Sequence, residues 1–150
     1  MREVSKLIEF IISLDGINNK TAIKDKVVSK FNLIRDRSVY YCDYYAIRFS
    51  QSASKSFSNT VLSLSALQKY DNLPFLVCLV GSEVNQIFLA NTTFLIRISH
   101  SSQALTEQNI RGSFNGSDIM KEYQGINNQR DNIVALFAFH QEFSFEDNLP

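Results

Sequence analysis

The side chains of this chain that could do chemistry are basic and hydroxyl-bearing residues gathered between positions 20 and 55. This segment carries eight Lys or Arg against three Asp, a net charge of +5, whereas residues 112–150 carry two against six acidic residues, a net charge of −4. Lys and Arg neutralise the phosphates of nucleic acids, so a charge gathered in this way favours a phosphate-bearing partner although the whole chain is neutral. The candidate phosphate contacts are Lys24, Lys30, Arg35, Arg37 and Lys55.

A second group of polar side chains stands where the first predicted strand ends, near Phe49. Arg48, Ser50, Gln51 and Ser52 supply a guanidinium, two hydroxyls and an amide, and side chains of these types bind nucleic-acid backbones. Surface loops are polar for general reasons as well. The nucleic-acid interpretation is favoured when this loop is taken together with the lysine-rich helix before it and with the later loops, which would form one donor-rich rim at an edge of the sheet.

Residues 99–118 form the most polar stretch, and its second half is the most distinctive. Donors alternate there at Asn109, Arg111, Ser113 and Asn115, and Gly112 and Gly116 would let the backbone approach phosphates or base edges closely. The alternative is a turn followed by a helix cap, with Ser117 or Asp118 as the capping residue. The sequence leaves both interpretations open.

Just before this stretch, Arg97, His100 and Ser101 extend the predicted set of DNA contacts. A histidine beside serines at a strand end is typically a hydrogen-bonded loop residue, which makes nucleophilic or metal chemistry at His100 the weaker interpretation. The His140-Gln141-Glu142 sequence resembles the start of a zinc deaminase signature, but the chain has no paired cysteines downstream of it.

A metal-dependent nuclease commonly places a carboxylate two positions before a lysine, and no Asp or Glu of this chain has a Lys at that position. Glu122 has a glutamine at the same spacing, a short pattern that occurs often by chance. The nuclease alternative would therefore use an unusual Mg²⁺ centre built from Asp43, Asp118 or Glu122. Without cleavage, the sequence predicts no metal and no cofactor.

The cellular setting is predicted from cysteines and apolar runs. Cys42 and Cys78 both lie in apolar stretches, which favours two buried thiols over a disulfide. Residues 1–14 are interrupted by charges and lack a cleavage site, so they do not fit a signal peptide, and no run approaches the roughly 20 apolar residues of a membrane span. The sequence predicts a cytoplasmic protein without membrane contact.

Periodicity predicts the elements that must position these side chains. Apolar residues recur at helical spacing over residues 3–14 and again after Thr21, the expected N-cap of a second helix ending at Phe31. Residues 39–49 fit a long strand, 74–81 a central strand buried on both faces, 87–98 its hairpin partner, and 131–139 a last helix. Residues 61–67 fit either a strand or a helical turn.

These elements predict an α+β fold with two N-terminal helices, a mixed and largely antiparallel sheet, and a C-terminal helix. Closure of the sheet into a barrel is left open. A length of 150 residues is typical of one domain, so residues 1–150 are expected to form a single domain, either as a whole protein or as the N-terminal specificity domain of a longer one.

Three segments resemble restriction-modification proteins: YYAIRFS (44–50), FLANTTFLIRISHSS (88–102) and NIRGSFNGSDI (109–119). They are similar to parts of type II restriction endonucleases or of the DNA-specificity domains of McrBC-like systems, over about residues 40–120. The resemblance implies double-stranded bacterial DNA as the partner. It also implies a specificity domain separate from the cleavage machinery. The absence of a carboxylate two positions before a lysine would fit such a domain.

The expected function is sequence-specific binding of double-stranded DNA in a restriction system, alone, as a homodimer or with other restriction subunits. Two alternatives remain: a Mg²⁺-dependent restriction endonuclease, and a protein-interaction domain whose aromatic strand pairs with a partner. DNA binding that weakens steeply with salt would support the first, and metal-dependent nicking would support the endonuclease.

Overall fold

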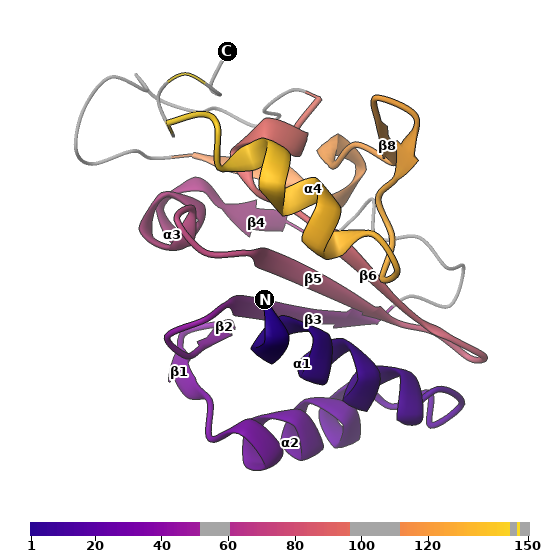
Figure 1. The fold of residues 1–150 in the computed structure, drawn as a ribbon. Coiled ribbons are helices and arrows are strands. Elements are labelled where there is room, and N and C mark those ends of the chain that lie inside the picture. Colours follow the sequence, from indigo (N-terminus) through magenta and orange to yellow (C-terminus); the bar gives the residue numbers. More distant parts are fainter. Residues whose placement is uncertain (52–60, 97–111, 145–146, 148–150) are drawn as a thin grey trace.

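Two helices open the chain and pack together against one face of a sheet (Figure 1). The computed structural model describes residues 1–51, 61–96, 112–144 and 147. Helix α1 (Arg2–Ser13) buries Val4, Leu7, Ile8 and Ile11, the stripe predicted from its periodicity. Helix α2 (Lys20–Phe31) buries fewer residues and exposes its lysines. Both predicted helices are confirmed.

The start of α2 differs from the prediction. Asn19, not Thr21, is the N-cap: its side chain accepts a hydrogen bond of 2.9 Å from the backbone N–H of Ala22. Thr21 lies inside the first turn. Asn is at least as good a cap as Thr, and the earlier start brings Lys20 into the helix, four residues before Lys24 and therefore on the same face.

The main sheet has five strands in the order β1-β2-β3-β5-β6. Strands β1 (Ile34–Asp36), β2 (Val39–Tyr41) and β3 (Ala46–Gln51) form an antiparallel meander, and β5 (Phe75–Val80) forms a hairpin with β6 (Asn85–Leu89). Strand β3 pairs with β5 in parallel, from Ala46 opposite Phe75 to Gln51 opposite Val80. The predicted α+β class and the mixed, largely antiparallel sheet are confirmed. The sheet is open, with β1 and β6 as its edges, and does not close into a barrel.

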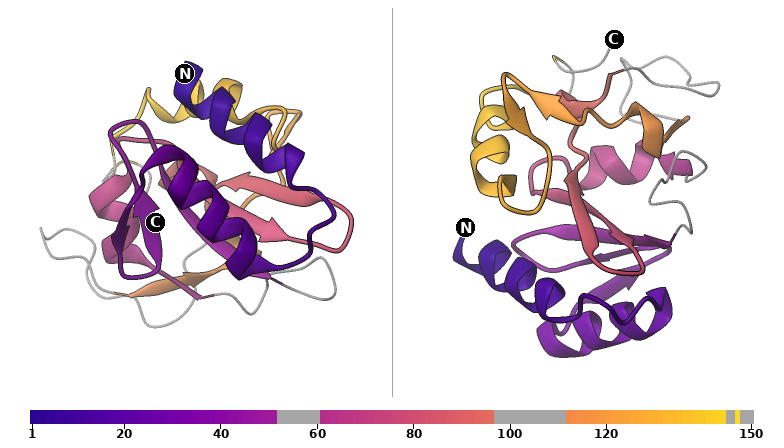
Figure 2. Two further views of the ribbon diagram at one scale, coloured as in Figure 1. Left: turned by 90° about the horizontal axis from the view of Figure 1, so that it is seen from below. Right: turned by 90° about the vertical axis from the view of Figure 1, so that its right-hand side faces the viewer.

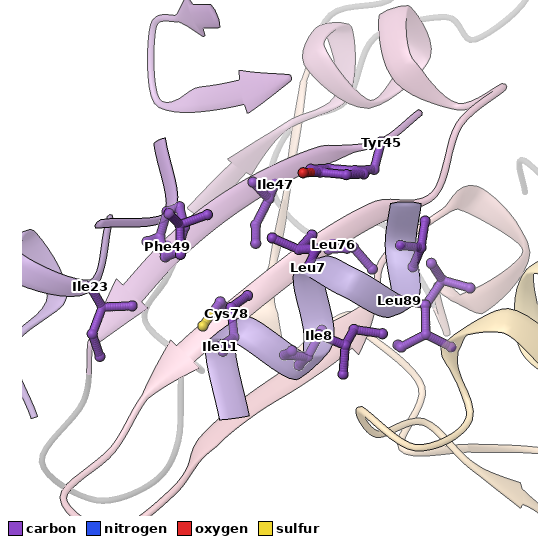
Figure 3. Packing of buried hydrophobic residues seen from close by; sticks show 14 of the residues in the cluster. Leu7, Ile8, Ile11, Ile23, Tyr45, Ile47, Phe49, Leu76, Cys78 and Leu89 are labelled. Carbon is purple, nitrogen blue, oxygen red and sulfur yellow. The ribbon is translucent and has the colours of Figure 1, made fainter. Parts of the chain in front are cut away.

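Each face of the sheet has its own apolar core. Alternate residues of β3 and β5, among them Ile47 and Cys78, face α1 and α2 (Figure 3), where Leu7 and Ile11 pack on them. On the other face Val77 packs with α3 (Leu64–Tyr70) and with the small sheet of β4 (Val61–Ser63) and β7 (Ser113–Asn115). Strand β5 is buried along its whole length, as predicted for a central strand.

The predicted long strand over residues 39–49 is wrong, because the chain turns between β2 and β3. The backbone N–H of Cys42 donates to the carbonyl of Tyr45 at 3.1 Å and closes the turn. No Gly or Pro marks this turn, so the aromatic run concealed it. Residues 61–67, left open between two assignments, contain both: β4 ends at Ser63, whose side chain caps α3.

The predicted strand over residues 87–98 is also too long. Strand β6 ends at Leu89, and Thr92–Phe94 form a 3-10 turn (η1). After β7 follow a second 3-10 turn, η2 (Gly116–Asp118), and a short hairpin of β8 (Glu122–Tyr123) and β9 (Ile126–Asn127).

Helix α4 (Ile133–His140) confirms the predicted last helix, and it packs beside β6 and η1 (Figures 1 and 2). None of the helices formed by the described residues is both long and apolar enough to cross a lipid bilayer.

Candidate nucleic-acid interface

A pocket of about 460 Å³ lies where the start of α2 meets the β1–β2 hairpin and β3. We call it the basic pocket. Five of its lining residues are Lys or Arg, and none is Asp or Glu. The lining residues are Lys20 and Lys24 of α2, Arg35 of β1, Arg37 and Ser38 of the hairpin turn, Tyr40 of β2, and Arg48 and Phe49 of β3.

The two lysines reach the pocket because β3 holds the beginning of α2. Gln51, the last residue of β3, accepts a hydrogen bond of 2.9 Å from the backbone N–H of Lys20 and donates from Nε2 to the backbone carbonyl and the side chain of Asn18. Gln51 was predicted to contact DNA. The structure gives it internal partners, and it positions Lys20 and Lys24 through the helix start.

Lys24 is partly neutralised by its neighbour. Its ammonium lies 2.6 Å from a carboxylate oxygen of Asp25, and this hydrogen bond raises the pKa of Lys24. The ammonium also lies 5.8 Å from the centre of the Tyr40 ring. Because Asp25 is largely exposed and does not line the pocket, the pocket keeps an excess of positive charge.

The β1–β2 hairpin carries two arginines toward the pocket, Arg35 on β1 and Arg37 in the turn. Arg37 has a left-handed backbone, with φ of 58°, and its carbonyl accepts a hydrogen bond of 3.0 Å from Nε of Arg35. A tight turn between antiparallel strands needs such a positive φ, which a non-glycine residue adopts at some cost.

Asp36, between these arginines, is directed to the other side of the hairpin. Its carboxylate accepts hydrogen bonds from Lys69 at 2.8 Å and from the hydroxyl of Tyr70, both on α3. The hydrogen bond from Lys69, followed by that from Tyr70, holds the pKa of Asp36 below 3.8. Helix α3 thereby holds the hairpin in place and binds the acidic side chain that lies between Arg35 and Arg37 in the sequence.

The replacement Asp36→Asn is expected to destabilise the protein by about 1 kcal/mol at neutral pH. The folded-state pKa of Asp36 is depressed, so its contribution is present above the unfolded-state pKa and is lost as the pH falls through the folded-state value. Urea unfolding of both proteins from neutral pH to about pH 3 should therefore show the difference shrinking below pH 3.8. A difference that did not change with pH would contradict the assigned hydrogen bonds.

Arg48 projects from β3 and is half-buried. One of its terminal nitrogens, Nη1, donates to the hydroxyl of Ser38 at 2.6 Å, while its Nε is buried and has no hydrogen-bond partner among the described residues. Burial lowers the pKa of Arg48, since a desolvated guanidinium is less stable in its charged form.

Four of the residues predicted to bind DNA thus converge on one pocket: Lys24, Arg35, Arg37 and Arg48. The other lining residues are Lys20, Ser38, Tyr40 and Phe49, which were not predicted to bind DNA. The spacing of four residues between Lys20 and Lys24 could have predicted that both lie on one face of the helix, but only if Asn19 is recognised as the N-cap. Ser38 could not be predicted as a pocket residue, because its position depends on the β1–β2 hairpin.

Other predicted contacts lie elsewhere. Lys30 is at the far end of α2, with its ammonium 5.7 Å from the centre of the Phe10 ring, beside a larger, mostly apolar cleft of about 710 Å³ between α1, α2 and the turn after β2. Ser50 is buried in β3. Ser52, Lys55, Arg97, His100, Ser101, Asn109 and Arg111 lie outside the described residues.

Ser113 and Asn115 belong to β7, on the opposite face of the sheet from α1 and α2. Asn115 and Asp118 form a capping box around η2: the backbone N–H of Asn115 donates to the carboxylate of Asp118 at 2.8 Å. The capping interpretation of this segment is therefore correct for its described part, although Asn115 rather than Ser117 or Asp118 is the N-cap.

The residues considered for a nuclease do not share an element. Asp43 lies in the turn before β3, Asp118 is buried within its capping box, and Glu122 is exposed on β8. Over the part of the chain that the structure describes, no three His, Cys, Asp or Glu side chains gather closely enough to hold a metal ion.

Both cysteines are free thiols, as predicted: Cys78 is buried and Cys42 half-buried. Burial raises the pKa of the Cys78 thiol to about 12, which makes it a poor nucleophile. His140 is buried and hydrogen-bonded to the hydroxyl of Thr93 and the carbonyl of Asp71. Cys78 is therefore a residue of the apolar core, and His140 is a buried residue held by hydrogen bonds.

Comparison of the chain with protein-family models, with curated proteins and with solved structures gave no match. The basic pocket is therefore the feature of the structure that bears most directly on function.

Proposed function

We propose that this chain is a sequence-specific, double-stranded DNA-binding domain of a bacterial restriction system, acting in the cytoplasm. One observation carries the proposal: four cations predicted from sequence to contact DNA, together with Lys20, line a single pocket that no acidic side chain lines. A concentration of positive charge on one side of a neutral protein is the electrostatic pattern of a nucleic-acid interface.

The β1–β2 hairpin supplies an exposed part of this interface. Arg35 and Arg37 are exposed, so they can approach phosphates on a duplex without a change in the fold. Phosphate contacts position a protein on DNA but do not read its sequence. In this proposal base contacts come from the segments after β3 and before β7, of which residues 52–60 and 97–111 lie outside the described part of the chain.

The first test is fluorescence-anisotropy binding to a randomised duplex library at low and moderate salt, with and without Mg²⁺, followed by a gel of the recovered DNA. Binding that selects a short motif and leaves the DNA intact would establish a specificity domain. Cleaved DNA would establish the Mg²⁺-dependent endonuclease instead. Absence of binding at low salt would exclude both and leave the protein-interaction domain, for which the apolar cleft and the exposed Tyr44 at its rim are the candidate surface.

The replacement Arg37→Ala is expected to reduce the salt dependence of duplex binding. Each phosphate contact contributes about one unit to the slope of log K against log salt concentration, so this variant should have a slope shallower by about 1, and Arg35→Ala should behave alike. The measurement is a salt titration of affinity for one duplex.

Lys26→Ala is the matched control, because Lys26 is an exposed cation of α2 that does not line the pocket. It should leave the slope unchanged. Equal losses for Lys26→Ala and Arg37→Ala would show that the DNA responds to the general positive charge of this region and not to the pocket.

A further inference from the structure

Arg48 is the one guanidinium of the pocket that is withdrawn from solvent without a compensating carboxylate among the lining residues. Its Nη1 is satisfied by Ser38, but its Nε is buried and has no partner in the described part of the chain. A charge without a counter-ion is costly to bury, and the cost falls when an anion accepts hydrogen bonds from the terminal nitrogens of the guanidinium.

The groups around Arg48 are suited to such an anion. Ser38 accepts a hydrogen bond from Arg48, which leaves its own hydroxyl hydrogen available to donate. Lys20 and Arg37 also line the pocket, and Asp25 and Asp36 do not, since Asp25 pairs with Lys24 and Asp36 is bonded to α3. The pocket therefore offers several donors and no competing acceptor charge.

The chemistry of the donors selects the class of anion. A planar guanidinium matches two oxygens of a phosphate at once, and the remaining oxygens of that phosphate can accept from a hydroxyl and an ammonium. A terminal or free phosphate has three or four such oxygens and up to two charges near neutral pH, so it can engage more of these donors than a carboxylate, which has two oxygens and a single charge. A cavity of about 460 Å³ has room for a phosphate together with the sugar that carries it.

We propose that the basic pocket is a binding site for one phosphate group, in which Arg48 and Ser38 are the principal contacts and Lys20 and Arg37 add charge. This inference deepens the proposed function, on which it rests where the phosphate belongs to DNA. A terminal phosphate of a DNA strand and a free phosphate share this chemistry, and a phosphodiester of a duplex offers two non-bridging oxygens and one charge to the same donors. The experiment separates these three ligands.

The test has a first arm without DNA. Inorganic phosphate is titrated at constant ionic strength into the wild-type protein, and binding is followed by the amide NMR signals of residues 35–48 and by the rise in melting temperature. Saturable binding is expected in the wild type. Arg48→Met should weaken phosphate binding about ten- to a hundredfold, the loss expected for charge-assisted hydrogen bonds to an anion.

Two further variants keep the test decisive if Arg48→Met fails to fold. Ser38→Ala changes an exposed turn residue and should weaken phosphate binding about tenfold, while Arg48→Lys keeps the charge but loses the planar fork and should weaken it too. Lys26→Ala removes a charge from the same helix outside the pocket and should not change it. Equal phosphate affinities in the wild type and Ser38→Ala, with Arg48→Lys also unchanged, would overturn the proposal.

The second arm measures duplex binding of the same proteins, with and without a 5′-terminal phosphate. Parallel losses of phosphate and duplex affinity would support both proposals, and a dependence on the 5′-phosphate would assign the pocket to a strand end. If the wild type binds phosphate but not DNA, the phosphate site is supported and the proposed function is excluded, which leaves a free phosphate compound as the ligand. If the wild type binds the duplex but not phosphate, and Arg48→Met binds the duplex equally well, the phosphate site is excluded and the proposed function is kept.

Discussion

The replacement Asp71→Ala is expected to lower the free energy of unfolding by about 4 kcal/mol, because it removes the acceptor of a buried hydrogen-bond network. The Asp71 carboxylate is 3% exposed and accepts from the backbone N–H of Thr92 at 3.1 Å, from the Thr92 hydroxyl at 2.7 Å and from the Asn91 amide at 3.1 Å. Nε2 of His140 lies 3.4 Å from the same carboxylate. Alanine would leave the backbone N–H and the hydroxyl of Thr92 without this acceptor in a dry environment, whereas Asn91 and His140 would keep backbone carbonyls as acceptors.

Urea unfolding monitored by circular dichroism measures this loss. Asp43→Ala is the matched control, because Asp43 is an exposed aspartate in a turn, and its removal should change stability by no more than about 0.5 kcal/mol. Asp71→Asn keeps the size and one acceptor oxygen, so it should fall between the wild type and Asp71→Ala. If Asp71→Ala were as mild as Asp43→Ala, the network would not hold the end of α3 to η1.

The replacement Asn128→Ala is expected to cost about 3 kcal/mol, since Asn128 serves as a strand partner for the edge of the sheet. Its amide accepts from the backbone N–H of Leu89 at 2.8 Å and donates to the carbonyls of Leu89 at 2.9 Å and Met120 at 2.8 Å. The side chain is almost fully buried. Alanine would leave one N–H and two carbonyl groups of the backbone unpaired beside β6.

The neighbouring Asn127 provides the control, because it is the same residue type but its side chain is exposed. Asn127→Ala should stay within about 0.5 kcal/mol of the wild type in the same unfolding experiment. Hydrogen exchange adds a local measurement: the Leu89 amide should lose protection in Asn128→Ala and keep it in Asn127→Ala. Unchanged protection of Leu89 in Asn128→Ala would contradict this role.

Local periodicity was sufficient for the elements whose burial has a simple pattern. Helix α1 shows one apolar stripe, and β5 is buried on both faces between Pro74 and Gly81, so each could be predicted with nearly correct ends. The run from Val39 to Phe49 was predicted as one strand because aromatic residues occupy both β2 and β3 and the turn between them. Asn128 and Asp71 could not be predicted as structural residues, since their partners are 39 and about 20 positions away.

The candidate site was predictable in composition but not in shape. Arg35, Arg37 and Arg48 were identified as basic side chains near a predicted strand, yet their convergence depends on the hairpin turn at Arg37 and on the contact of Asp36 with α3. The sequence does not show that Asp36 is occupied elsewhere. From a count of charges alone, Asp36 would be expected to neutralise either Arg35 or Arg37.

The order of folding follows from the parallel pairing of β3 with β5. All residues that line the basic pocket lie between positions 20 and 49, in a helix and a meander whose partners are close in sequence and can form quickly. Strand β3 gains its second neighbour only when the segment from residue 52 to residue 74 has closed as a loop, which costs entropy before the pairing compensates for it. During synthesis the pocket segment is therefore made before the strand that buries β3, and we expect the joining of β3 to β5 to be the slow step that makes the pocket rigid.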